Sequence, residues 1–456
     1  MYPDARDFLD LLKTLDEHPF PPARELFDRD RELIVTRAPG RLDVMGGIAD
    51  YSGSLVLELP IAEATFAAIQ VNTQPQLNFV TLLDDEPHHS SFSISLGELV
   101  GVEYETARSL FREDKSWAAY VAGVFLVLMR ERGQDFTSGA NILIFSRVPP
   151  GKGVSSSAAL EVAVMEAVTA AFNIDVSPRD VALLCQRVEN MVVGAPCGVM
   201  DQMTAVFGER DRLLALLCQP AELKNMIALP PQLKLWGIDS GIRHSVGGSD
   251  YGSVRAGAFM GHRIIGEGAY LANISPAEFE EKYAARLPER MSGEEFLAQY
   301  AGTADPVTKI DPQREYAVRL PTAHPIYENA RVQRFVELMD QVRFEELGEL
   351  MYASHRSYTA LGLNSEGTDL LVELVSKEGP ASGLFGAKIT GGGSGGTVAV
   401  LGDQNSHDAI DRIVAAYAIQ TNHEPYIFTG SSSGSRTFGR VKAHCRGGPP
   451  WPPSQE

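Results

Sequence analysis

The chain of 456 residues is too long for one compact core and suits two or three domains of ordinary size. Apolar residues make up 44% of it and charged residues 22%, as in a water-soluble globular protein. The formal net charge of −19 repels phosphate backbones and anionic lipid surfaces, so we expect neither nucleic acid nor a membrane as a partner.

Cysteine usage and the first residues bear on the compartment. Four cysteines lack both the C-x-x-C spacing of a metal or redox motif and the density of a disulfide scaffold. Acidic residues are scattered through residues 1–20, unlike a secretory signal, and no stretch approaches the roughly 20 apolar residues of a membrane span. A cytoplasmic location is therefore predicted.

In the first half of the chain, periodicity predicts alternating strands and helices. Residues 5–17 predict an amphipathic helix, and residues 31–40 predict a strand that runs into a Pro-Gly turn. Residues 55–71 predict two strands with Pro60 at a break or an edge. A helix over 115–133 and a strand over 140–148 follow, and then a helix that is apolar nearly all round, which predicts burial.

Further along, Ser177 and Pro178 form an N-cap and first-turn pair for a helix that extends to about Val193. A second set of elements follows, with a strand at 233–241 and a charged helical stretch at 275–299. No low-complexity linker separates the halves, which predicts domains over residues 1–212 and 213–440 with a packed interface. The proline-rich residues 441–456 predict a disordered tail.

The segment 147–163, RVPPGKGVSSSAALEVA, is the strongest local signal for chemistry. Glycines allow a close approach of the backbone to a ligand, and free N–H groups at the start of a helix bind anionic phosphate. Its serines can donate hydrogen bonds or bind Mg²⁺. The P-loop spacing is missing, because Gly153 follows Lys152. An ordinary capped helix after a tight turn is the alternative.

Two acids near the segment GAPCGVMDQM, residues 194–203, are candidate polar groups of a site. Glu189 lies at the edge of the apolar stripe of its predicted helix, where a carboxylate needs a partner or a metal. Asp201 follows a turn rich in Gly and Pro. Taken singly, each is better explained as a solvated acid.

The glycine-rich segment 387–401 predicts a turn between strands that brings backbone close to a ligand, or a tight structural turn. The pattern G-x-S-x-G occurs around Ser394 and around Ser432, but a hydrolase nucleophile elbow requires a following helix, which neither sequence predicts. The acidic and histidine-containing residues 84–89 have metal-capable side chains, and a solvated loop is the favoured interpretation.

The three glycine- or serine-rich segments at 37–54, 147–163 and 387–401 resemble, in this order and separation, those of the GHMP kinases, a superfamily that includes galactokinase, homoserine kinase and mevalonate kinase. The likeness extends from about Arg37 to Gly439. Residues 38–54, 194–202, 238–255 and 350–358 resemble the sugar-kinase branch, and the motifs at 46–54 and 236–248 are similar to those of the kinase portion of plant L-arabinokinases.

The resemblance implies an α+β fold of two domains, with an N-terminal half like domain 2 of ribosomal protein S5, a ferredoxin-like C-terminal half, and the active site in the cleft between them. It implies ATP and Mg²⁺ as ligands and a sugar as substrate. Asp201 would be the general base or orienting group, and Arg41 would neutralise charge near the transferred phosphoryl group and keep Asp201 ionised.

The other implied roles fall into three sets. Metal ligands would be Ser157 and Glu189. Positions that contact the sugar would be Asp43, Gly47, Ile48, Asp50, Gly198 and Tyr251. ATP would contact Pro150, Gly151, Gly153, Val154, Ser155, Ser156, Ser157 and Ala158, together with Gly391, Gly392 and Gly393 from the second domain.

The chain departs from the galactokinase pattern G-R-x-N-x-x-G-E-H-x-D-Y, whose Glu-His pair reaches the C6 end of galactose. Gly47 and Ile48 stand in those places, and Asp43 replaces the Asn. L-Arabinopyranose has the ring stereochemistry of galactose without C6, so L-arabinose is the predicted substrate, and restoring Glu-His is expected to shift preference toward galactose. The alternatives are a galactokinase, a sugar- and ATP-binding sensor without catalysis, and a hydrolase at Ser394 or Ser432.

Overall fold

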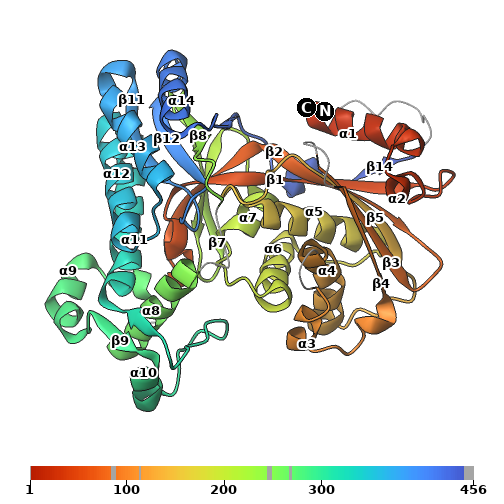
Figure 1. Ribbon diagram of the computed structural model, residues 1–456, viewed down its shortest axis with the longest axis horizontal. Coiled ribbons are helices and arrows are strands. Elements are labelled where there is room, and N and C mark those ends of the chain that lie inside the picture. Colours follow the sequence, from red (N-terminus) through yellow and green to blue (C-terminus); the bar gives the residue numbers. More distant parts are fainter. Residues whose placement is uncertain (1, 84–88, 112–114, 244–248, 267–269, 446–456) are drawn as a thin grey trace.

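The computed structural model describes residues 2–83, 89–111, 115–243, 249–266 and 270–445. Its first part contains an eight-stranded mixed sheet in which six strands lie in the order β14-β1-β2-β5-β3-β4, and β6 and β7 extend it beside β2 (Figure 1). The strands are β1 (Leu33–Met45), β2 (Leu55–Val71), β3 (Gln76–Leu83), β4 (Ser90–Ser95), β5 (Ala140–Ser146), β6 (Arg212–Leu217), β7 (Glu222–Ala228) and β14 (Val441–Ala443).

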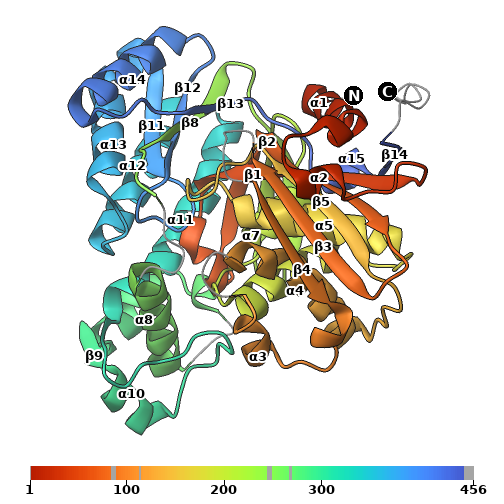
Figure 2. The same cartoon turned by 45° about the vertical axis from the view of Figure 1, so that its right-hand side comes forward.

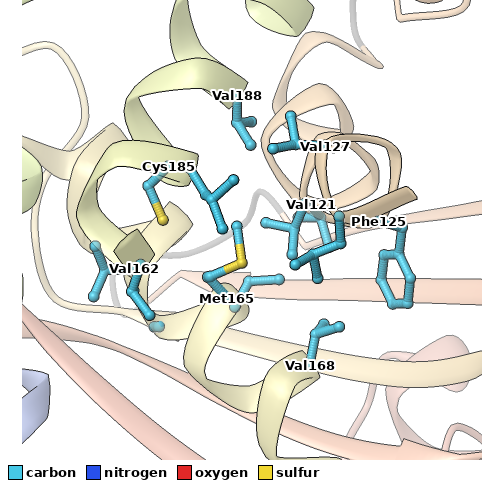
Figure 3. Packing of buried hydrophobic residues seen from close by; sticks show 14 of the residues in the cluster. Val121, Phe125, Val127, Val162, Met165, Val168, Cys185 and Val188 are labelled. Atoms are coloured by element: carbon cyan, nitrogen blue, oxygen red, sulfur yellow. The ribbon is translucent and has the colours of Figure 1, made fainter. Parts of the chain in front are cut away.

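Helices cover both faces of this sheet. One face carries α4 to α7, and the other carries α1 and α2 near the N-terminus (Figure 1). In the core, side chains of α4 and α5, such as Phe125 and Met165, pack together with Cys185 of α6 and with Val188, which directly follows α6 (Figure 3). The helices are α1 (Pro3–Lys13), α2 (Pro21–Arg24), α3 (Tyr104–Arg108), α4 (Ser116–Arg132), α5 (Ser156–Ala171), α6 (Pro178–Arg187) and α7 (Met200–Phe207).

The second part has a four-stranded antiparallel sheet in the order β11-β12-β8-β13. Its strands and helices follow one another as βαββαβ, the ferredoxin-like arrangement that the resemblance implied. The elements are β8 (Leu233–Asp239), α11 (Arg319–Asp340), α12 (Phe344–Ala360), α13 (Glu366–Glu378), β11 (Leu384–Ile389), β12 (Thr397–Asp403), α14 (His407–Thr421) and β13 (Ile427–Thr429); α15 (Ser435–Phe438) then leads back to the first sheet.

Between β8 and α11 the chain forms a small helical region at the end of α11, opposite the second sheet (Figures 1 and 2). It contains α8 (Ser249–Ile265), α9 (Pro276–Glu278), β9 (Arg290–Ser292), α10 (Gly293–Tyr300) and β10 (Glu315–Ala317). The predicted charged helix over 275–299 is therefore wrong, because the stretch is broken into short helices and a strand.

Two strand predictions are also wrong. The Pro-Gly pair at 39–40 does not end β1, which continues to Met45 through a local shift in its pairing with β2. Likewise β2 is one strand through Pro60. On one side, β2 pairs with β6 through residues 55–58 and with β5 through residues 65–71. Pro60 lies in the gap between these two partner strands, so the N–H that proline lacks removes no hydrogen bond of the sheet.

The predicted domain boundaries need correction. Strands β6 and β7 belong to the first sheet, so that sheet extends past residue 212 to Ala228, and β8 of the second sheet begins at Leu233. Residues 441–443 form β14 on the edge of β1 rather than part of a disordered tail. Both errors arise because the strands pair with partners far away in the chain, which local composition does not reveal.

Other predictions are confirmed. Helix α4 ends at Gly133, whose φ of +62° is the left-handed conformation predicted for its C-cap. Ser177 caps α6 by accepting a hydrogen bond from the Asp180 backbone N–H. The two parts share a buried apolar cluster that joins β1 and β2 to β8, β12, α11 and α12, so their interface is packed. Within the described residues, no helix combines the length and apolar character needed to cross a membrane.

Candidate functional site

One pocket brings together residues from segments that are far apart in the sequence. It lies where β1, the start of α5, the turn before α7, α8 and the β11–β12 turn meet. It is lined by Arg41, Ile48, Asp50, Gly151, Gly153, Ser155, Ser156, Ser157, Glu189, Pro196, Cys197, Gly198, Met200, Asp201, Tyr251 and Gly392. Thirteen of these residues were singled out from the sequence; only Pro196, Cys197 and Met200 were not.

A paired arginine and aspartate occupy the centre of the pocket. Arg41 Nε donates to Asp201 Oδ1 at 2.9 Å and its Nη2 donates to Asp201 Oδ2 at 3.0 Å, a bidentate geometry that fixes both groups. Asp201 lies in the first turn of α7. The third nitrogen of Arg41 donates to the Gly153 carbonyl at 2.7 Å, which connects the pair to the loop before α5.

That loop has the conformation of an anion-binding turn. Gly151, Gly153 and Ser155 have φ values of +75°, +70° and +61°, and this alternation turns successive backbone N–H groups toward one side. The 16-residue helix α5 begins directly after it at Ser156. The Ser155 hydroxyl is buried and has no hydrogen-bond partner among the described residues. The loop and helix dipole thus suit a phosphate group.

Glu189 lies beside this loop, in a π-helical segment (Val188–Val193) that follows α6. Burial raises its pKa to about 7, although hydrogen bonds from Ser157, Cys197 and Gln202 work in the opposite direction. The Gln202 amide nitrogen donates to Glu189 at 2.8 Å and reaches Glu161 at 3.2 Å. No ion pair of Glu189 is found in the described part of the chain, so the carboxylate lacks the cation that burial calls for.

Asp50 and Gly198 form the opposite part of the pocket. A Cβ atom at Gly198 would lie 1.8 Å from Asp50 Oδ2, so only glycine allows this carboxylate to approach the turn. Burial, and secondly the neighbouring Asp201, raise the pKa of Asp50 to about 7. Tyr251 of α8 completes this side, and its ring meets the ring of Tyr51 edge-on at 6.4 Å.

Several predicted contacts are not at the pocket surface. Asp43 is fully buried, forms an ion pair with Lys388 at 2.5 Å and does not line this pocket, so its contact with a sugar stays a prediction. Gly47 packs against Tyr358, and Gly393 packs against Leu363 and Tyr358. A Cβ atom at Gly391 would lie 3.0 Å from Arg41 Nη2. Pro150 is exposed and lines a neighbouring pocket that shares Gly151, whereas Val154 and Ala158 are buried and do not line either pocket.

Sequence reasoning missed three buried groups that support the site. Glu58 of β2 lies 3.3 Å from Arg41 Nε on the side away from the pocket, and burial raises the pKa of its carboxyl well above the ordinary value. Lys388 holds Asp43, and Tyr358 contacts Gly47. Glu58 and Lys388 could have been found from the sequence, because each is a charged residue within an otherwise apolar strand, and a buried charge needs a partner.

The hydrolase interpretation fails at both serines. Ser394 is followed by β12 and not by a helix. Ser432 is buried and donates to the Ile61 carbonyl, although the short α15 does follow it, contrary to expectation. Residues 84–88 of the metal-capable segment lie outside the described residues. In the part of the chain that the structure describes, no three His, Cys, Asp or Glu side chains gather as a metal cluster.

Comparison with known proteins places these features in a family. Family models match at residues 119–209 (GHMP kinases N terminal domain), 335–420 (GHMP kinases C terminal) and 24–71 (galactokinase galactose-binding signature). The chain is 44% identical to L-arabinokinase of Arabidopsis thaliana over 92% of its length, and it spans about half of that relative (48%). It is 30% identical to galactokinase of Streptomyces coelicolor, covering 91% of this chain and 96% of the relative.

Solved structures agree with the fold. Lactococcus lactis galactokinase complexed with galactose superposes with a TM-score of 0.74 at 21% identity, covering 94% of this chain and 99% of that one. A mevalonate kinase superposes with a TM-score of 0.53 at 15% identity. The shared two-domain fold, the three family models and the full-length similarity to galactokinases together show that this chain belongs to the galactokinase-like branch of the GHMP kinase superfamily.

Proposed function

We propose that this protein is an ATP-dependent sugar kinase that phosphorylates the anomeric hydroxyl of L-arabinose, giving β-L-arabinose 1-phosphate and ADP. One observation carries the proposal: the bidentate Arg41–Asp201 pair lies in the same pocket as the anion-binding loop before α5. A hydroxyl beside Asp201 would thus lie next to a phosphate held by the loop. The 44% identity to an L-arabinokinase supports the same activity.

In this reaction the anomeric oxygen attacks the γ-phosphorus of ATP, the bond from that phosphorus to the β–γ bridging oxygen breaks, and ADP leaves. Asp201 accepts or orients the hydroxyl proton. The guanidinium of Arg41 holds the carboxylate in place and offsets negative charge on the transferred group. Positioning and positive charge suffice, because phosphoryl transfer proceeds through a loose transition state.

The pocket fits a bound Mg²⁺. Its lining has three carboxylates, Asp50, Glu189 and Asp201, but one cation, Arg41, which is committed to Asp201. Ser157 and Glu189 would hold the ion, with phosphate oxygens and water completing its shell, as Mg²⁺ prefers. When bound, the ion would neutralise charge on the β- and γ-phosphates.

The sugar end of the pocket favours a pentose. Ile48 lines it and is 1% exposed, where the galactokinase pattern has histidine. A 6-hydroxyl placed against this side chain would lose its hydrogen bonds to water without replacement, at a cost of roughly 1–3 kcal/mol. Asp50 and Tyr251 remain available to the ring hydroxyls.

Initial rates with L-arabinose, D-galactose and related sugars test the proposal. We expect ADP release with several-fold or greater preference in kcat/KM for L-arabinose. A higher kcat/KM for galactose would favour the second candidate, a galactokinase, which the galactose-binding signature at residues 24–71 supports. Binding of both ligands without ADP release from any sugar would instead indicate a sensor, against which the intact Arg41–Asp201 geometry argues.

A further inference from the structure

Tyr358 of α12 packs directly against Gly47 and Ile48, the positions at which the chain departs from the galactokinase pattern. Its side chain is fully buried, and a Cβ atom at Gly47 would lie 1.8 Å from its hydroxyl oxygen and 3.0 Å from Cζ. Gly47 also has a φ of +46°, in the region that favours glycine. The tyrosine therefore fills the space that any side chain at position 47 would need.

The hydroxyl of Tyr358 also fixes the backbone next to the pocket. It accepts a hydrogen bond from the Ile48 N–H at 2.9 Å and donates to the Gly391 carbonyl at 2.9 Å. One group thus joins the segment that presents Ile48 to the turn that presents Gly392. Both residues line the pocket, so a shift of Tyr358 would reach the sugar and phosphate ends together.

Surrounding contacts hold the tyrosine in this place. Its ring packs edge-on against His324 with centroids 5.3 Å apart, and the Lys388 ammonium lies 5.5 Å from the ring centroid. A Cβ atom at Gly393 would approach its Cδ1 to 3.2 Å. With so little free volume around it, the ring has no obvious room to retreat from a larger residue at position 47.

We propose that Tyr358 is a positioning residue that sets sugar specificity. Together with Gly47 it fills the space that a side chain would need in order to hydrogen-bond an exocyclic hydroxymethyl group of the sugar. It also holds Ile48 against the substrate. The inference rests on the proposed function. It assigns the site to aldopentoses in their pyranose form. It also revises the expectation that Glu and His at 47 and 48 alone would confer galactose preference, because the glutamate needs the volume that Tyr358 occupies.

The test compares four variants, Tyr358→Phe, Tyr358→Leu, Gly47→Glu/Ile48→His, and the last combined with Tyr358→Leu. For each, kcat and KM are measured with L-arabinose and D-galactose, and sugar binding is measured by calorimetry. Tyr417→Phe is the matched control, because Tyr417 is a buried tyrosine whose hydroxyl donates to the Ser240 carbonyl at 2.7 Å away from the pocket.

We expect Tyr358→Phe to raise KM for L-arabinose about fivefold with a smaller change in kcat, since it frees the Ile48 N–H but keeps the ring. Tyr358→Leu should lower the arabinose-to-galactose ratio of kcat/KM about tenfold. The Gly47→Glu/Ile48→His variant should bind neither sugar, and adding Tyr358→Leu should restore galactose binding. Tyr417→Phe should lower thermal stability without moving the ratio.

The proposal is overturned if Gly47→Glu/Ile48→His gains galactose activity with Tyr358 in place, or if neither Tyr358 variant moves the KM or the ratio beyond the Tyr417→Phe control. Should Tyr358→Leu fail to fold, Tyr358→Phe decides through its KM. A wild-type protein that binds the sugars without phosphorylating them would contradict the proposed function alone, because the binding ratios still test Tyr358. Failure to bind either sugar would overturn both.

Discussion

At the scale of single residues, the site depends on how charge is balanced in a small buried volume. Arg41 lies between two carboxylates, Asp201 on the pocket side and Glu58 on the buried side. Burial by itself would lower the pKa of Arg41, but Asp201, Glu58 and Asp43 together raise it above its ordinary value. The arginine therefore stays charged and holds the Asp201 carboxylate in its bidentate geometry at the pocket.

Replacing Asp201 by Asn keeps the shape of the side chain but removes its charge and its ability to accept a proton. We expect kcat to fall about 100-fold or more, with sugar binding changed far less, since general-base groups contribute factors of this size. Steady-state kinetics and calorimetry on the same variant check this. Unchanged kcat would mean that Asp201 neither accepts the proton nor orients the hydroxyl.

Asp50 predicts a dependence of stability on pH. Its pKa is raised in the folded protein from 3.8 to about 7, so the folded state binds this proton more tightly than the unfolded state does. The stabilisation is fully present below the unfolded pKa near 4 and is lost as the pH rises through about 7. The free energy of unfolding of the ligand-free protein should therefore fall from pH 5 to pH 8.

Asp50→Asn removes the titrating group and should make urea-unfolding free energies less dependent on pH in that range. Glu281→Gln, at an exposed carboxylate, is the control and should leave the slope as it is. An identical slope in Asp50→Asn and wild type would show that Asp50 titrates in the folded protein as it does in the unfolded chain.

At the scale of elements, short turns place the reactive groups. The turn before α7 brings Gly198 against Asp50, and the glycine-rich turn between β11 and β12 brings Gly392 into the pocket beside the loop before α5. The sequence predicted both turns from their glycines. It did not predict that β1 and β2 continue through their prolines, because that depends on which strands pair on each side.

Gly198→Ala should raise KM for the sugar about tenfold or more, because the new methyl group and the Asp50 carboxylate cannot share the same space. The matched control is Gly252→Ala in α8, where a Cβ atom would meet nothing within 4 Å. Sugar titrations of both variants give the comparison. Equal KM values in the two variants would show that Asp50 does not contact the sugar.

At the scale of the whole molecule, a buried ion pair and a shared apolar cluster hold the two parts together. Lys388 of β11 and Asp43 of β1 are both fully buried and 2.5 Å apart, and Asp43 also accepts hydrogen bonds from the Gly47 and Gly391 N–H groups. The pair therefore joins the residues around Gly47, next to the pocket, to the second sheet.

Lys388→Met leaves the Asp43 carboxylate buried without its cation and should lower the free energy of unfolding by about 3–5 kcal/mol. The double variant Asp43→Asn/Lys388→Met removes both charges and should recover part of that loss. Urea unfolding of the single and double variants measures the difference. A Lys388→Met protein as stable as wild type would mean that the pair adds nothing to the joint.

The sequence by itself was enough to single out the loop at 151–157 from its glycines, its serines and the helix that follows, and to select Arg41, Glu189 and Asp201 through the resemblance to the kinase superfamily. The pocket brings these three side chains together with five residues of that loop. Only the tertiary structure decided which neighbours support them. Asp43 forms a buried ion pair with Lys388, Tyr358 fills the space beside Gly47, and β6, β7 and β14 belong to the first sheet. These outcomes depend on contacts between residues that are far apart in the chain. A local sequence pattern cannot encode the shape of a cavity whose walls come from several such segments.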